Sequence, residues 1–192
     1  MRLYDYELSG NCYKIRLFLS ILNKSFDTQT VDFYPGREHK TEAFLALNPL
    51  GQLPILEDAG QVLSGSDVIL SHLAAQYDAS QKWHPQNLRG DISKWIHVAD
   101  EITKTASAAR LHDTFFYDLN IDTARAGAKK VFRSLDEHLW FAEQRGHDWL
   151  VPAAHPTIAD IACFPYVALS EEGGISRQDY PAIRRWCDRI KR

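Results

Sequence analysis

The first 77 residues alternate between short strand-like and helix-like patterns. Residues 2–6 alternate like a half-buried strand, and residues 28–32 predict a second strand. Between them, residues 13–22 repeat apolar side chains at helical spacing, namely Ile15, Phe18, Leu19 and Leu22. A strand, a helix and a strand in this order predict a βαβ unit, whose two strands pair in parallel.

A hairpin and another helix are predicted next. Residues 55–57 and 61–63 are short apolar runs on either side of the turn sequence Asp58, Ala59 and Gly60. Ser66 then stands where a helix cap is expected, before a helical repeat that continues to Tyr77. The predicted order of the first domain is therefore β-α-β followed by β-β-α.

The pattern changes after residue 77. A polar linker spans residues 78–88, and from residue 89 only helical periodicity remains, interrupted by Gly and Pro. One long amphipathic helix is predicted from apolar residues three and four apart: Ala124, Ala128, Val131, Leu135, Leu139 and Ala142. We therefore predict an α/β domain over residues 1–77 and an all-α domain over residues 89–192.

Thr157 and Asp160 give the clearest local signal in the helical domain. They follow Pro156, and their spacing matches a capping box in which Asp replaces the usual Glu or Gln. In such a box the Thr157 hydroxyl accepts from a backbone N–H near Asp160, and the Asp160 carboxylate accepts from the Thr157 N–H. We interpret the pair as a folding element worth about 1 kcal/mol, not as catalytic groups.

Composition and charge exclude several functional classes. A net charge of −3 with scattered Lys and Arg argues against nucleic acid as a partner. No segment reaches the roughly 18–20 apolar residues of a membrane-spanning helix, and the N-terminus enters a strand pattern without a signal-peptide core. We therefore expect a cytoplasmic protein with no membrane association.

Cysteine and histidine usage points in the same direction. Cys12, Cys163 and Cys187 are odd in number and lack C-x-x-C spacing, so a disulfide framework is not expected. The eight His residues form neither an H-E-x-x-H motif nor a close Cys/His cluster. We expect a reducing compartment and no metal.

Pro54 marks the first candidate binding segment. Residues 48–53 are rich in turn formers and lead through Pro54 into the strand at residues 55–57. Proline lacks an N–H and is common at strand starts, so an ordinary trans proline explains its position. A cis Leu53-Pro54 bond would instead turn the backbone N–H and C=O of Leu53 towards an extended ligand, as in strand addition.

Ser9 and Asn11, just before a helix, form the second candidate site. If the ligand is a small peptide with a thiol, its reactive form is the thiolate. Lowering the pKa of that thiol by two units requires roughly 2.7 kcal/mol of preferential stabilisation of the anion. A hydroxyl that donates to a thiolate supplies about 1.5–3 kcal/mol, and a helix N-terminus adds about 0.3–1 kcal/mol. Ser9 and the helix end therefore suffice to activate the thiol of a small peptide. Capping also explains Ser9, and for Asn11 the roles of cap and of second donor to sulfur stay open.

Neighbouring side chains have competing interpretations. Tyr4 and Tyr6 are alternative hydroxyl donors, although their alternation within a strand favours packing. Cys12 lies in the first helical turn, where the helix dipole favours a thiolate, but without a second cysteine nearby we expect a buried packing role. Lys14 and Lys40 are either site residues or solvated surface lysines.

Taken together, these features resemble the cytosolic glutathione transferase superfamily over essentially the whole chain. The similarity lies in a thioredoxin-like βαβ-ββα unit with Pro54 before its third strand, and in a helical domain with a Thr-x-x-Asp cap. The run 36–54 is similar to the theta, phi and beta classes, and the Ser9-x-Asn11 spacing is similar to the nu class. The resemblance implies a homodimer and contacts to glutathione from His39, Lys40, Gln52, Leu53, Pro54, Gly65 and Ser66.

Gly65 departs from the pattern of this family, which usually has Glu or Asp beside the serine. That acid ordinarily faces the ammonium of glutathione, whereas Ser66 can still receive the α-carboxylate at a helix N-terminus. Asp67 either substitutes in part for the acid or, more simply, favours the helix dipole as an acid at the start of the helix. We expect glutathione to bind about tenfold more weakly than with the acid present, and Gly65→Glu to tighten binding.

The resemblance implies a glutathione transferase with a role in detoxification. Ser9 and Asn11 would activate the thiol of glutathione, the co-substrate, for attack on a hydrophobic electrophile. The electrophile pocket is expected between the domains, beside Arg110 and Phe115. Two alternatives stay open: a glutathione-dependent disulfide reductase, and a non-catalytic relative with a binding or regulatory role.

Overall fold

The computed structural model describes all residues, 1–192, in two compact units, Met1–Gln81 and Lys82–Arg192. The first unit is built on a four-stranded sheet of β1 (Arg2–Asp5), β2 (Asp27–Thr30), β3 (Ile55–Asp58) and β4 (Gln61–Ser64). Their order is β2-β1-β3-β4, with β1 and β2 parallel and the other two pairs antiparallel. The predicted α/β thioredoxin-like domain is confirmed.

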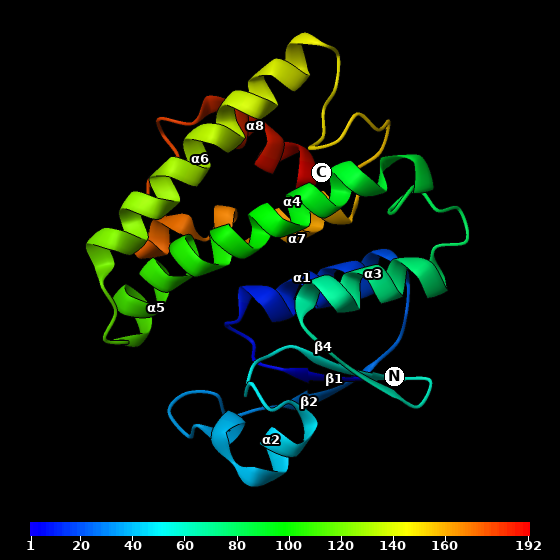
Figure 1. The fold of residues 1–192 in the computed structure, drawn as a ribbon, viewed down its shortest axis with the longest axis vertical. Helices are drawn as coiled ribbons and strands as arrows, with labels where there is room; N and C mark the ends of the chain where they lie inside the picture. Colours follow the sequence, from blue (N-terminus) through cyan, green and yellow to red (C-terminus); the bar gives the residue numbers. More distant parts are fainter. The chain divides into compact units, whose positions relative to one another are not determined.

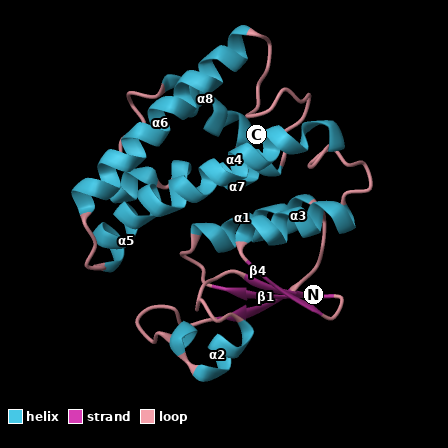
Figure 2. Cartoon of the chain, viewed as in Figure 1, coloured by secondary structure: helices cyan, strands magenta, loops and turns pink.

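Helices cover both faces of this sheet (Figures 1 and 2). α1 (Gly10–Ile21) connects β1 to β2, and α3 (Ser66–Tyr77) follows β4 and packs beside α1. The short α2 (Glu42–Leu47) lies on the opposite face, where Phe44 joins Val31 and Ile55 in a buried cluster. Sequence patterning did not indicate α2, because six residues are too few to establish a helical period.

The second unit contains helices only, as predicted. α4 (Arg89–Ile102) continues through a π-helical turn at Thr103–Ser107 into α5 (Ala108–Phe115), and α6 (Ile121–Gln144), α7 (Ile158–Ala168) and α8 (Pro181–Ile190) follow. The buried stripe of α6 matches the prediction except at one position, since Phe132 is buried and Val131 is only partly buried. None of the helices is long and apolar enough to cross a bilayer.

The predicted capping box at the start of α7 is confirmed. The Thr157 hydroxyl accepts from the Ala159 N–H at 3.3 Å, and the Asp160 carboxylate accepts from the Thr157 N–H at 2.8 Å. By contrast, Ser66 is the first residue of α3 and not its cap, which is Gly65. The prediction for Ser66 was wrong by one position because Gly65 has the positive φ that turns the chain into the helix.

Candidate functional site

The topology of the first unit brings the predicted site segments to one edge of the sheet. Tyr4 is paired with Ile55 in the antiparallel β1–β3 ladder, so the loop after β1, which carries Ser9, lies beside Pro54. Ile55 is also paired with Ser64, so Gly65 and Ser66 begin at this edge too. β2 is parallel to β1, and residues 31–40 therefore leave β2 on the same side.

Ser9 caps α1 with its side chain. Its backbone is extended, with φ −79° and ψ 121°, and its Oγ accepts from the Cys12 N–H at 3.2 Å. This bond uses a lone pair of the hydroxyl and leaves its proton for another acceptor. Ser9 thus caps the helix through its oxygen and keeps one O–H to donate, which the neighbouring Cys12 sulfur can also accept.

Cys12 is fully buried beside Ser9. Burial raises the pKa of the Cys12 thiol to about 12, and hydrogen bonds from Ser9 and from the Tyr6 backbone offset this only in part. The thiol therefore stays protonated at neutral pH despite its place in the first helical turn. Its burial confirms the packing interpretation.

Asn11 lies inside α1, so the interpretation of Asn11 as the helix cap is wrong. Its Oδ1 is buried and has no hydrogen-bond partner in the protein. An unpaired buried acceptor costs about 1–3 kcal/mol, which a ligand donor at this position would relieve.

The tyrosines near Ser9 have other partners. The Tyr4 hydroxyl donates to Glu57 at 2.8 Å, and this bond raises the Tyr4 pKa. Tyr6 stacks on Phe33, with ring centroids 5.5 Å apart. Lys14 is only 2% exposed, so its interpretation as a solvated lysine is wrong.

The Leu53-Pro54 bond is cis, and the interpretation of an ordinary trans proline is therefore wrong. The backbone N–H and C=O of Leu53 form no hydrogen bond within the protein. Asn48 organises the preceding loop, because its side chain donates to the Gln52 carbonyl at 2.9 Å and accepts from the Leu50 N–H at 3.2 Å. Asn48 opens the turn-rich segment, but its position along the sequence does not reveal this role.

His39 and Lys40 lie in a short 3₁₀ turn, Glu38–Lys40, that adjoins this loop. A Cβ on Gly51 would lie 2.7 Å from the His39 carbonyl oxygen and 3.2 Å from the Lys40 Nζ. The His39 ring is buried, stacks on Phe33 at 3.9 Å, and has an unpartnered Nδ1. Burial, with the charges of Lys40 and Arg37, lowers the His39 pKa, so the imidazole is neutral at pH 7.

The backbone conformation of Gly65 changes the result expected for Gly65→Glu. Its φ is +93°, and an added Cβ would lie 2.8 Å from Asp67 Oδ1. A Glu at this position would be strained and would bring a second carboxylate close to Asp67. Tighter glutathione binding is therefore not expected from Gly65→Glu.

Arg110 and Phe115 lie together on α5 in the second unit. The Arg110 guanidinium is 5.2 Å from the Phe115 ring, and its Nε donates to the Glu172 carboxylate. Both side chains are largely buried. No group of three or more His, Cys, Asp or Glu residues is placed to hold a metal ion.

Comparisons with known proteins show which families the chain resembles. The family model described as "Glutathione S-transferase, N-terminal domain" matches residues 3–81. Glutathione S-transferase theta-1 of Bos taurus is 35% identical over 104 residues, which are 52% of this chain and only 43% of the bovine protein. A maleylacetoacetate isomerase of Pseudomonas aeruginosa is 25% identical over 98% of this chain and 90% of its own length.

A solved structure extends the similarity over both units. The crystal structure of a glutathione S-transferase from Pseudomonas fluorescens has a TM-score of 0.86 and 29% identity, and the match covers 99% of this chain and 94% of that chain. The family model matches the first unit, and the solved structure shares the fold of both units. Residues 3–81 therefore belong to the glutathione S-transferase N-terminal domain family, and the chain as a whole is similar to glutathione S-transferases.

Proposed function

We propose that this chain is a glutathione transferase in which Ser9 activates the glutathione thiol. The observation that supports this assignment is the Ser9 hydroxyl, whose oxygen accepts from the Cys12 N–H and whose proton would be donated to a bound thiolate, a stronger acceptor than the neutral Cys12 thiol. The neighbouring Cys12 stays protonated and offers no competing anion. A hydroxyl hydrogen bond of about 1.5–3 kcal/mol and the N-terminus of α1, about 0.3–1 kcal/mol, favour the thiolate.

Asn11 is proposed as the second group at the sulfur. Its amide lies in the first turn of α1, which Ser9 caps, and its Nδ2 would donate to the sulfur, whereas the buried and unpartnered Oδ1 can only accept a hydrogen bond. The thiolate then attacks the electrophilic carbon and forms a thioether, while the leaving group takes the displaced electron pair.

Glutathione binding is proposed along the same sheet edge. The free N–H and C=O of Leu53 support strand addition to the peptide backbone. The N-terminus of α3 at Ser66 supports binding of the α-carboxylate. His39, Lys40, Gln52, Pro54 and Gly65 would complete the peptide site, and Arg110 and Phe115 would contact a hydrophobic electrophile.

Two assays on Ser9→Ala and Cys12→Ala test this function. With a chloronitrobenzene-type electrophile, we expect Ser9→Ala to lower kcat by roughly 10–100-fold with little change in glutathione affinity. Cys12→Ala should stay largely active, and its inactivation would contradict the role given to Ser9. Turnover confined to a small disulfide would favour the reductase alternative, and glutathione binding without turnover in either assay would favour a non-catalytic protein.

A further inference from the structure

Ser9 lies at the end of a short loop between the first strand and the first helix. β1 ends at Asp5 and α1 begins at Gly10, so residues 6–9 connect them. One backbone hydrogen bond closes this loop, from the Ser9 N–H to the Tyr6 carbonyl at 2.9 Å. A hydroxyl that must stabilise a thiolate requires a fixed position, and a misplacement of about 1 Å costs up to 10²-fold in rate.

Arg16 contacts both the start and the middle of this loop. From α1, its Nη1 donates to the Asp5 carboxylate at the end of β1, and its Nη2 donates to the Glu7 carbonyl at 2.9 Å. The guanidinium also lies 5.8 Å from the ring of Tyr13, one turn earlier on α1. The planar fork of arginine makes this double contact possible, whereas a lysine ammonium cannot reproduce its geometry.

Asp5 makes this contact more than a surface ion pair. The residue is only 7% exposed, and its backbone carbonyl accepts from the Val31 N–H at 2.8 Å, next to the parallel β1–β2 ladder. A buried carboxylate is costly unless it is paired, so Arg16 is bound to a rigid point of the sheet. The loop carbonyl held by the same guanidinium is thereby fixed to that point.

We propose that Arg16 is a positioning residue that holds the loop of residues 6–9, and through it the Ser9 hydroxyl, in the orientation needed to activate a bound thiol. The catalytic part of this role rests on the proposed function. Arg16 acts through the loop and does not contact the reacting atoms. The positioning itself is a property of the free protein and can be measured without a ligand.

Hydrogen exchange of the free protein tests the positioning directly. In Arg16→Gln we expect the amides of residues 7–13 to exchange about tenfold faster than in the wild type. Asp58→Asn is the matched control, because Asp58 is 6% exposed, ends β3 and binds His72 and Tyr77 of α3. It should destabilise the same sheet, as measured by urea unfolding, without changing exchange in residues 7–13. Equal exchange in Arg16→Gln and the wild type would overturn the proposal.

The thiol pKa of bound glutathione tests the consequence. Thiolate absorbance followed against pH should show a pKa about one unit higher in Arg16→Gln, with kcat about tenfold lower and KM for glutathione within threefold of the wild type. Arg16→Lys keeps the charge, and we expect it to leave the thiol pKa raised; full recovery would mean that charge alone suffices and would overturn positioning. Absence of glutathione binding by the wild type would refute the proposed function, while the exchange result would still decide whether Arg16 holds the loop.

Discussion

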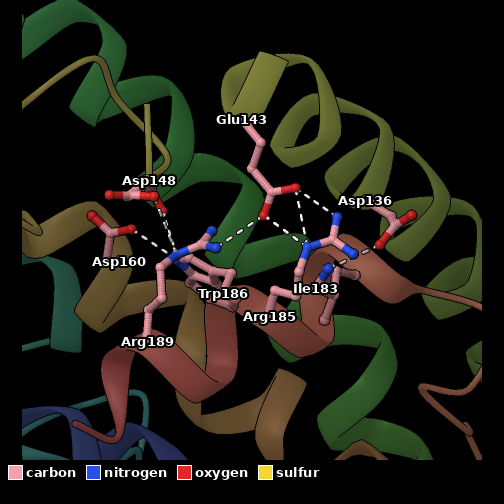
Figure 3. A network of polar contacts seen from close by, with 8 residues as sticks. All are labelled: Asp136, Glu143, Asp148, Asp160, Ile183, Arg185, Trp186 and Arg189. Atoms are coloured by element: carbon pink, nitrogen blue, oxygen red, sulfur yellow. Dashed lines mark hydrogen bonds and ion pairs between the residues drawn. The ribbon is translucent and has the colours of Figure 1, made fainter. Parts of the chain in front are cut away.

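The indole N–H of Trp186 donates to the Asp160 carboxylate at 2.9 Å and joins α8 to the start of α7 (Figure 3). The same carboxylate accepts from the Leu150 N–H and from the N–H and hydroxyl of Thr157. Burial raises the pKa of Asp160, and these four hydrogen bonds oppose the shift. Asp160 thus caps α7 and also holds α8 and the loop at Leu150 by hydrogen bonds.

Asp160→Ala should cost on the order of 3–5 kcal/mol of unfolding free energy, because it leaves four buried donors without an acceptor. Trp186→Phe removes only one of the donors and should cost about 1–3 kcal/mol. Urea unfolding of the two variants measures this difference. A loss below about 1 kcal/mol in Asp160→Ala would show that water replaces the carboxylate.

Asp136→Ala should destabilise the protein by about 0.5–2 kcal/mol. Asp136 Oδ1 accepts from the Ile183 N–H at 2.8 Å, whereas Tyr180, the N-cap residue of α8, provides no side-chain cap (Figure 3). A side chain of α6 therefore caps α8. Asp188→Ala is the control, because Asp188 is exposed and its removal takes away one negative charge without removing a helix cap. Equal midpoints of urea unfolding for the two variants would exclude a capping role for Asp136.

Acid should unfold the protein partly through Asp58. Burial raises the Asp58 pKa, but hydrogen bonds from His72 and Tyr77 outweigh it, and the net shift is downward. Because the folded-state pKa lies below the unfolded value of about 3.9, this group stabilises the fold above about pH 4 and loses its effect as pH falls through the folded pKa.

Tyr77→Phe should therefore move the acid-unfolding midpoint, followed by circular dichroism, to higher pH. Tyr180→Phe is the control, because the Tyr180 hydroxyl contacts only the Lys129 carbonyl, at 3.5 Å. Identical midpoints for wild type and Tyr77→Phe would show that Asp58 does not need the tyrosine.

Gly65→Ala should lower stability by roughly 1–2 kcal/mol, because φ at this position is +93° and the new Cβ would approach Asp67. Gly90→Ala is the matched change at a helical glycine with open space around it, and should stabilise by about 0.4–1 kcal/mol. Thermal unfolding of both variants provides the measurement. Opposite signs are expected, and a neutral Gly65→Ala would mean that the loop adapts.

We expect a homodimer, with a mass by light scattering near twice the 22.0 kDa of one chain. The expectation follows from the resemblance of the chain to glutathione transferases. A mass of one chain at micromolar concentration would contradict it.

Sequence patterning predicted those parts of the fold whose signals are local. The α6 stripe and the Thr157–Asp160 box depend on residues three or four positions apart, and both are present. The one mismatch is local: positions 131 and 132 both lie three or four residues from Ala128 and Leu135, so the apolar spacing does not distinguish Val131 from Phe132. The π-helical turn at Thr103–Ser107 has no such local signal, and it was not predicted.

The candidate site was predictable only as far as its segments. Ser9 and Pro54 were found from their neighbours along the chain, and strand pairing explains why they share one edge. The burial of single side chains was harder to predict from the sequence. Lys14 is buried, for example, although lysine is usually exposed. The unpartnered atoms of Asn11 and His39 depend on contacts across several elements, which spacing along the chain does not encode.

The buried cysteines have a consequence for a protein that is proposed to handle electrophiles. Burial raises the pKa of Cys12 to about 12 and that of Cys187 to about 11, and Cys163 is buried with its Sγ donating to the Trp95 carbonyl at 3.4 Å. The thiols of Cys12 and Cys187 are therefore protonated at pH 7. The three cysteines of the chain thus resist alkylation by electrophiles, which would instead react with the thiol that the chain is proposed to bind.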